Sequence, residues 1–516
     1  MFVVETFSIA RAFALLLVAV AGLELVWWVW RRRRYDLHKM PGPKPLPFIG
    51  HAHLLPGGSK PQLSAKIHEW ALEYGKLYRL QVLGENMVVV HDPKFIEEHL
   101  HTSAHTDTPK ASTYQHFNKL VSPYNLNGIL TSPKPDAKYK SFRKTIAAAF
   151  SSVGLKRGYP HFLSKAKQVA SKIEVQTKAG ASIDIQDLGV RFAFDCIGHF
   201  AYDLDFNSVD NKAHPLLEAI EFATADAMAG YSNPFWEPYK RLMPFTALAK
   251  KTRKMYQKLY HEYDKIMKAV SLEGNPPEED VSIRAQLMRL RNPLENNRKA
   301  TYEERYVETM GFLDAGTDTT GHQIGWTMMC LCTHPEVQDR VFDELVENGL
   351  AGKGCRDLEY GDLANLTYLS QVSKETLRRV SSAPAPSMRR IEKDMDVLGY
   401  RVPKGTLVMG QPHTLNTCPW MWTNGDEFNP DRWNKDQGDE AAQRIWTFSS
   451  GARDCIGQRL AMLELQMLLV VLLSKFRFSL DPRMGGWDGA IKRSFNSVTL
   501  TCEGGMWLRA EHRNST

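Results

Sequence analysis

The chain reads Phe448-Ser-Ser-Gly451-Ala-Arg453-Asp-Cys455-Ile-Gly457 and then turns apolar over Gln458 to Lys475. The apolar stretch has the pattern of a buried helix, so the thiol of Cys455 stands just before a helix N-terminus. Because the N–H groups and the dipole of a helix end favour negative sulfur, we expect a thiolate at Cys455. The two glycines of the loop allow tight turns and a close approach of the backbone to a flat group.

The flat group that these residues predict is haem. Phe448 can pack on a ring face, and Arg453 can pair with a propionate. The alternative is a buried structural cysteine in a glycine-rich turn. The loop resembles the haem-binding loop of the cytochrome P450 family. This resemblance implies that Cys455 is the axial ligand of haem iron and that Gly451 and Gly457 belong to the cofactor site.

Two upstream segments extend the resemblance. Glu375-Thr-Leu-Arg378 places a carboxylate and a guanidinium one helical turn apart. Such a pair is usually a solvated surface salt bridge. Phe428-Asn-Pro430-Asp-Arg432-Trp433 then supplies a second arginine before the cysteine, as in the family. The resemblance implies a buried cluster of Glu375, Arg378 and Arg432 that holds the cysteine loop.

The helical run Thr301 to Thr333 contains Asp314-Ala315-Gly316-Thr317-Asp318-Thr319-Thr320-Gly321. Its glycines and threonines weaken a helix, so we expect a local opening or kink. The alternative is a glycine- and threonine-rich crossing of two core helices. The run resembles the oxygen-binding motif of the family, which implies that Ala315 and Gly316 line the oxygen pocket. By the same resemblance Thr319 positions a water and Asp318 feeds a proton relay.

Haem propionates require cations. Tyr139-Lys-Ser-Phe-Arg143 resembles a propionate-binding segment of the family, with Arg143 as the cation and Tyr139 where tryptophan is usual. The Tyr139 hydroxyl either replaces the indole N–H as donor or the contact is lost. A further segment, Ala385-Pro-Ser-Met-Arg389-Arg390, resembles a second propionate-binding segment of the family. Counting back from Pro403 to Asp394 in the spacing usual for the family favours Arg389 over Arg390 as the propionate partner.

The N-terminus predicts a membrane anchor. The stretch Ala12 to Trp30 is almost wholly apolar, long enough to span a bilayer core of about 30 Å, and Arg31-Arg-Arg-Arg34 follows it. No small-residue cleavage site is evident, which indicates a retained single-pass anchor in the endoplasmic reticulum membrane with a cytosolic catalytic domain. The alternative is an amphipathic presequence for another organelle. A proline-rich hinge follows, from Pro41 to Gly50.

The expected organisation is a membrane anchor at 1–34, a hinge at 35–61 and one haem-thiolate catalytic domain at 62–516. The expected fold is mainly α with small β-sheets, the cytochrome P450 fold. One sheet is expected to include a hairpin of Lys76 to Leu83 with Met87 to Val90, and the coil candidates are His101 to Ala137 and Glu273 to Glu304.

Composition narrows the class of function. A net charge of +7, from 65 basic and 58 acidic residues, gives no nucleic-acid signature. Seven cysteines without paired spacing predict no zinc site. Some basic side chains could form a surface on which an acidic flavoprotein docks; they are Lys138, Lys140, Lys144, Arg453 and Arg459.

The resemblance implies a haem-thiolate monooxygenase. Such an enzyme holds haem b and inserts one atom of dioxygen into a lipophilic substrate, such as a sterol, terpenoid, fatty acid or xenobiotic. Its electrons come from NADPH through NADPH-cytochrome P450 reductase, with cytochrome b5 as a second candidate donor. Two alternatives are an isomerase or dehydratase that acts on lipid peroxides without dioxygen, and a non-catalytic haem carrier. The intact pair Asp318-Thr319 argues against both.

Overall fold

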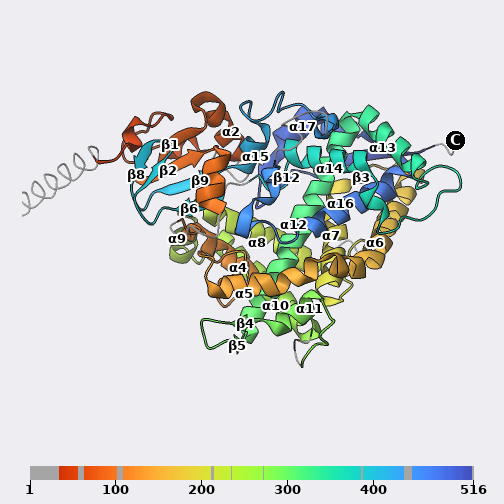
Figure 1. Ribbon diagram of the computed structural model, residues 1–516, viewed down its shortest axis with the longest axis horizontal. Coiled ribbons are helices and arrows are strands. Elements are labelled where there is room, and N and C mark those ends of the chain that lie inside the picture. Colours follow the sequence, from red (N-terminus) through yellow and green to blue (C-terminus); the bar gives the residue numbers. More distant parts are fainter. Residues whose placement is uncertain are drawn as a thin grey trace, which may run out of the picture.

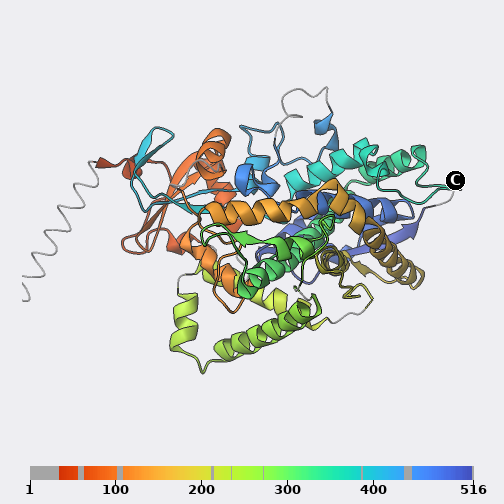
Figure 2. The ribbon, with the colours of Figure 1, turned by 60° about the horizontal axis from the view of Figure 1, so that its bottom comes forward.

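The computed structural model describes residues 34–55, 63–101, 108–210, 214–233, 235–270, 272, 274–384, 387–434 and 444–513. A small part built around a β-sheet packs beside a larger helical part, and the long helix α12 (Tyr302–Thr333) runs through the middle of the molecule (Figures 1 and 2). This arrangement confirms the expected mainly α fold with small sheets.

The largest sheet has four strands in the order β1-β2-β9-β6, with β2 and β9 parallel and the other pairs antiparallel. A three-stranded sheet has the order β10-β13-β3, and three two-stranded sheets complete the set. The strands are β1 (Leu77–Val82), β2 (Glu85–Val90), β3 (Ile183–Asp184), β4 (Arg291–Asn292), β5 (Arg298–Lys299), β6 (Ser387–Arg390), β7 (Met395–Val397), β8 (Tyr400–Val402), β9 (Leu407–Gly410), β10 (Phe476–Leu480), β11 (Ser494–Asn496), β12 (Leu500–Cys502) and β13 (Trp507–His512).

Helices make up most of the described chain. Besides α12 they are α2 (Leu63–Tyr74), α3 (Pro93–Phe95), α4 (Asn118–Val121), α5 (Ala137–Ala147), α6 (Ser152–Lys178), α7 (Ile185–Tyr202), α8 (Pro215–Ser232), α9 (Trp236–Leu242), α10 (Ala247–Val270), α11 (Ile283–Arg289), α13 (Pro335–Glu347), α14 (Thr367–Arg379), α15 (Pro412–Thr417), α16 (Gln458–Leu473) and α17 (Gly486–Arg493).

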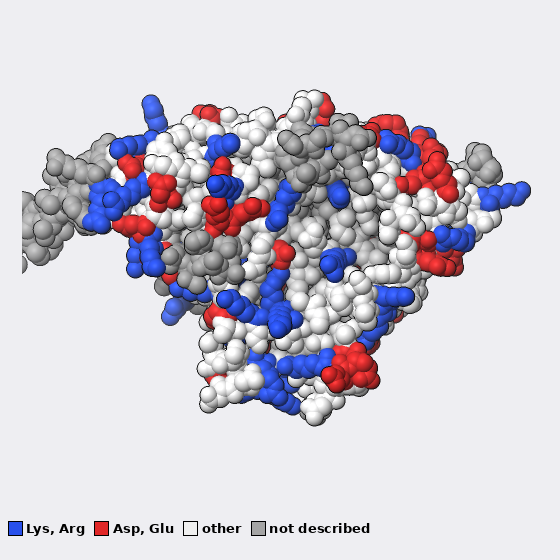
Figure 3. Space-filling view, in the orientation of Figure 1, with Lys and Arg blue, Asp and Glu red and all other residues white. Residues whose placement is uncertain are grey.

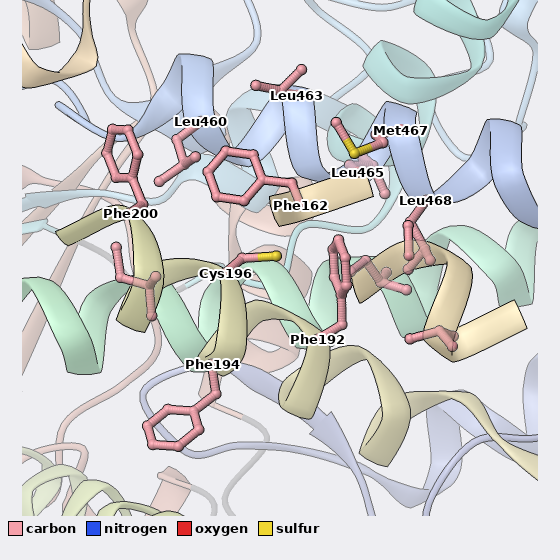
Figure 4. Close-up of a cluster of buried hydrophobic side chains, with 14 of the residues drawn as sticks. Phe162, Phe192, Phe194, Cys196, Phe200, Leu460, Leu463, Leu465, Met467 and Leu468 are labelled. Atoms are coloured by element: carbon pink, nitrogen blue, oxygen red, sulfur yellow. The ribbon is translucent and has the colours of Figure 1, made fainter. Parts of the chain in front are cut away.

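The main core lies where α6, α7, α12 and α16 meet. Figure 4 shows aromatic side chains of α6 and α7, among them Phe162 and Phe192, beside leucine and methionine side chains of α16. Leu468 and Met467 of α16 are at most 1% exposed. Burial of each such side chain contributes roughly 1.5–3 kcal/mol, so this core fixes the position of α16 and of the loop before it.

Helix α12 begins at a capping box. Thr301 Oγ1 accepts from the Glu304 N–H at 3.2 Å, and the Glu304 carboxylate accepts from the Thr301 N–H at 2.9 Å. Farther along, α12 crosses α7 closely at Gly321, where a Cβ would lie 2.4 Å from the Cα of Val190. Only glycine permits this approach.

The expected opening of the run Thr301 to Thr333 is wrong, since α12 is one continuous α-helix. The threonine hydroxyls bond back within the helix: Thr317 Oγ1 donates to the Leu313 carbonyl, and Thr319 Oγ1 donates to the Ala315 carbonyl, each at 2.7 Å. Such back-bonding weakens a helix, so the close packing against α7 is what keeps α12 intact.

The coil expectations were also partly wrong. Within 101–137 the chain forms the 3-10 helix Ser112–Phe117 and α4, and within 273–304 it forms α11 and the hairpin of β4 with β5. Short helices draw their stability from tertiary packing rather than from local propensity, so their sequence signal is weak. The hairpin of β1 and β2 was predicted correctly, with a tighter turn at Leu83-Gly84.

The predicted membrane segment Ala12 to Trp30 lies outside the described residues, as do parts of the predicted hinge. Among the residues that the structure does describe, no helix combines the length and the apolar character that crossing a membrane requires.

Candidate active site

The cysteine loop turns sharply before α16. Ser449 and Gly451 have positive φ values of 62° and 68°, and the Cys455 N–H donates to the Phe448 carbonyl at 2.9 Å. A Cβ at Gly451 would lie 2.6 Å from the carbonyl oxygen of His101, so this position accepts only glycine. Gly457 is the N-cap residue of α16. The loop therefore holds Cys455 at the helix end that the sequence predicted.

A cavity of about 370 Å³ lies between this loop and α12. The loop lines it with Phe448, Arg453, Cys455 and Gly457, and α12 lines it with Ala315, Gly316 and Thr319. Tyr139 and Arg143 of α5 complete the set of predicted residues on the wall. Gly451, Asp318 and Arg389 are not among its lining residues. The cavity thus brings together one thiol, the two α12 threonines Thr319 and Thr320, and several cations.

Burial raises the pKa of the Cys455 thiol above its usual value, although the N–H groups of Gly457 and Gln458 and the charge of Arg143 act to lower it. The thiolate at Cys455 stays a prediction, and it depends on a group bound at the sulfur. Desolvation of the charged sulfur outweighs the helix end. A cation bound to the sulfur reverses this balance, because a coordinating thiol is deprotonated.

Two of the predicted cations are engaged with the protein. Arg143 pairs with Asp454 of the cysteine loop. Arg453 donates to the carbonyls of Ser132 and Pro133 at 2.9 and 3.1 Å, and its guanidinium lies 4.3 Å from the centre of the Tyr139 ring. The Tyr139 hydroxyl donates to the Ala452 carbonyl at 3.0 Å, so it ties α5 to the loop.

The two arginines of β6 have different surroundings. Arg389 is 3% exposed, and its Nε has no hydrogen-bond partner in the described part of the chain. Arg390 instead donates to the Gly405 carbonyl at 2.9 Å and faces Glu85 at 3.3 Å on the outer side of the sheet. Side chains alternate between the faces of a strand, so only one of the two can face inward.

Lys110 joins this group of cations. It lines the cavity, forms a β-bridge with Arg389 and donates from Nζ to the Leu130 carbonyl. Burial, followed by the charges of Arg389, Arg453 and Arg143, lowers the pKa of Lys110 well below its usual value. Repulsion among four cations indicates that this side of the cavity suits an anionic group.

Behind the loop lies a buried charge cluster on α14. Glu375 and Arg378 are fully buried and joined by two hydrogen bonds of 2.8 and 2.9 Å. Arg378 also donates to three backbone carbonyls at 2.7 Å, those of Asn416, Gly425 and Glu427. Arg432 lies 3.4 Å from the Glu375 carboxylate. The structure therefore brings the three predicted residues together.

On α12, Thr319 lines the cavity, and Asp318 lies beside it. Burial, followed by the charge of Glu221, raises the pKa of Asp318 to about 7. Near neutral pH this carboxyl exists in both protonation states, as a group that holds and passes a proton requires. Ser382 packs on the same segment, because its hydroxyl donates to the Thr319 carbonyl at 2.8 Å.

Sequence reasoning missed Lys110 and Glu308, which both line the cavity. Lys110 lies in a segment that was assigned to coil, where no periodicity marks an inward residue. Glu308 lies seven residues before Ala315, two turns earlier on the same face of the helix. That spacing was available in the sequence, and it could have identified Glu308.

Three comparisons with known proteins agree with this geometry. The family model described as "Cytochrome P450" matches residues 40–502. Cytochrome P450 4d2 of Drosophila melanogaster is 27% identical, over 94% of this chain and 97% of its own, and cytochrome P450 3A28 of Bos taurus is 24% identical, over 89% of both. Among solved structures, the haem domain of cytochrome P450DA is similar in fold, with a TM-score of 0.76 and 22% identity, covering 92% of this chain and 98% of its own.

Proposed function

This chain belongs to the cytochrome P450 family, and from that premise we propose that it inserts one atom of dioxygen into a lipophilic small molecule. Members of the family are monooxygenases that hold haem b and receive electrons from NADPH through a reductase. The observation that carries the proposal is the cavity with the Cys455 thiol on one wall and the Thr319 hydroxyl on another.

The residues of the cavity fit haem. Cys455 offers one thiol, the ligand that favours O–O cleavage, and haem held there supplies the oxidation chemistry of the reaction. Lys110, Arg143 and Arg453 line the cavity, and Arg389 forms a β-bridge with Lys110, so two propionates would relieve the repulsion among these charges. The Arg389 Nε, buried and without a partner in the described chain, is a donor for such a group.

The α12 residues would handle water and protons. The Thr319 hydroxyl donates its hydrogen bond to the Ala315 carbonyl at 2.7 Å. The oxygen of the hydroxyl can therefore still accept a hydrogen bond from a molecule in the cavity. We assign to Thr319 the positioning of a water and to Asp318 the supply of protons to it. Delivery at the correct oxygen decides between oxidation of the substrate and release of hydrogen peroxide.

Thr319→Ala is expected to keep its haem and to release several times more hydrogen peroxide per NADPH consumed, because the positioned water is lost. The measurement is peroxide formed against NADPH oxidised in the presence of reductase. Thr317→Ala is the matched control, since Thr317 makes the same 2.7 Å bond to the carbonyl four residues before it but does not line the cavity. Equal peroxide yields from both variants would remove Thr319 from the mechanism.

Arg389→Ala is expected to lose haem roughly ten- to a hundredfold faster than the unaltered protein, because a charged hydrogen bond to a propionate contributes about 1.5–3 kcal/mol. Transfer of haem to a high-affinity acceptor protein measures the rate. The neighbouring variant Arg390→Ala removes the same charge on the outer side of the sheet and should change the rate less than twofold. A larger effect at Arg390 would exchange the two assignments.

The remaining parts of the proposal concern the reductase partner and the cellular localisation. A reductase would dock beside the cysteine loop, where Lys140 and Lys144 of α5 are exposed. Basic side chains gather over the region of α5 on the face drawn in Figure 3, with acidic groups interspersed elsewhere. Two other basic residues of the predicted docking surface already have partners within the protein. Lys138 pairs with Glu304 at 2.8 Å, and Arg453 donates to backbone carbonyls. A single-pass anchor in the endoplasmic reticulum membrane remains part of the proposal.

Turnover with isotopically labelled dioxygen tests the function. The haem-loaded protein, reductase, NADPH and a lipid extract should give products that carry one labelled oxygen atom. Consumption of lipid hydroperoxides without NADPH, with unlabelled rearranged products, would replace the proposal by the isomerase or dehydratase activity.

A further inference from the structure

The cavity-facing side of α12 begins at a carboxyl group. Glu308, Gly311, Ala315 and Thr319 all line the cavity at helical spacing, so they form one stripe along the helix. Seven residues separate Glu308 from Ala315, which is about 10 Å along the axis. A molecule in the cavity can therefore touch Glu308 while a carbon about two turns away lies beside the residues of the oxygen-binding motif.

In the described chain the Glu308 carboxyl has one recorded hydrogen-bond partner, the Ile129 N–H. Its side chain is buried, and both carboxyl oxygens accept from the Ile129 N–H, at 3.0 and 3.2 Å. Burial raises the pKa of Glu308 to about 8, against the opposing effects of the Ile129 N–H and the charge of Lys138. At neutral pH the carboxyl thus keeps its proton, and the structure records no acceptor for it among the residues described.

The surroundings of Glu308 favour a neutral guest. The neighbouring wall is apolar and includes Val121, Ile129 and Phe312. Lys138 and Glu304 pair with each other at 2.8 Å, and their charges act on Glu308 in opposite senses. A charged guest would lose its water in this buried place, whereas a carbonyl or hydroxyl oxygen would accept the carboxyl proton and satisfy a buried donor.

We propose that Glu308 is a substrate-binding residue whose carboxyl O–H donates to a neutral oxygen atom of an elongated, otherwise apolar substrate. The contact fixes the end of the molecule and selects for oxidation a carbon about 10 Å from that oxygen. This inference rests on the proposed function, because it concerns the substrate of the same cavity. A purely structural role of Glu308, as the anchor of the loop at Ile129, is the competing explanation.

Binding of two matched probes tests the proposal in the full haem-loaded chain, without reductase or NADPH. Methyl decyl ketone carries one oxygen acceptor, and dodecane has the same number of carbons and none. The protein is expected to bind the ketone about two- to tenfold more tightly, the range for one neutral hydrogen bond. Glu308→Gln keeps an N–H donor and should keep the preference, while Glu308→Leu should bring the ratio to one. Equal binding of both probes by the unaltered protein would overturn the proposal.

Infrared difference spectra supply a second readout, since Glu308→Leu also removes the acceptor of the Ile129 N–H. Adding the ketone should shift the C=O band of a protonated carboxyl, and adding dodecane should not. The shift should vanish in Glu308→Gln and persist in Glu464→Gln, which removes another buried carboxyl on α16. Absence of a ketone-dependent shift would refute the role of Glu308. Because no turnover is needed, this result is separate from failure of the labelled-oxygen experiment.

Discussion

Glu375→Ala is expected to destabilise the protein by about 3–5 kcal/mol and to yield chain without haem. The substitution leaves the guanidinium of Arg378 buried with no carboxylate, and an uncompensated buried charge carries that cost. It also removes the acceptor of the Asn429 N–H and of the Trp433 indole N–H, at 2.9 and 3.0 Å. The midpoint of urea unfolding and the haem content per chain are the two measurements.

A surface pair with the same spacing provides the control. Glu69 on α2 pairs with Lys66 at 2.6 Å, also three residues apart, and its side chain is 62% exposed. Glu69→Ala should cost less than about 1 kcal/mol, because water solvates the lysine that remains. If the two variants lost equal stability, or if Glu375→Ala stayed haem-replete and stable, burial of the α14 cluster would not have the importance that we give it.

Cys455→Ser is expected to reduce NADPH-dependent oxidation to an undetectable level. Serine has nearly the same size, so the loop and its hydrogen bonds should persist, but a hydroxyl does not give the electron-rich thiolate that favours O–O cleavage. The absorption spectrum of the reduced carbon monoxide complex, which depends on thiolate ligation, should lose its characteristic band. Activity and spectrum are measured on the same preparation, at equal haem content.

Cys355→Ser is the matched control, since Cys355 is exposed and does not line the cavity. It should leave activity and spectrum unchanged. A Cys455→Ser protein that kept both the thiolate spectrum and turnover would show that another cysteine is the ligand, and the assignment of the loop would fail.

The sequence predicted the elements whose signals are local and strong. Helices α12 and α16 follow long hydrophobic patterns, and the hairpin of β1 and β2 alternates around a tight turn. The short elements between 101 and 137 and between 273 and 304 were missed, because segments of four to seven residues become helical only when packed. The expected local opening of α12 is wrong for a similar reason, since packing against α7 outweighs poor helix propensity.

Within the site, the sequence identified the residues that belong to motifs but not the residues and charges that surround them. The thiol of Cys455, Thr319 of α12 and the pair Tyr139 and Arg143 of α5 were identified from their resemblance to motifs of the family, and the structure places them around one cavity. Lys110 and Glu308 were not identified. Lys110 lies in a segment without periodicity, whereas the spacing of Glu308 from Ala315 was available in the sequence. The pKa of each group depends on burial and on the sum of neighbouring charges, which a motif does not contain.

The sequence by itself identified the family, because the Cys455 loop and the run Asp314 to Gly321 resemble its motifs, and it predicted the thiol ligand and the helix that faces it. Regular spacing along a strand or helix then indicates which side chains share a face. Tertiary structure alone decided that the carboxyl of Glu308 meets the Ile129 N–H, 179 residues away in the chain, and that Lys110 faces Arg389. It also decided which ionisable groups are buried and desolvated. The free energy of a charge depends on every atom around it, and most of those atoms come from distant parts of the sequence.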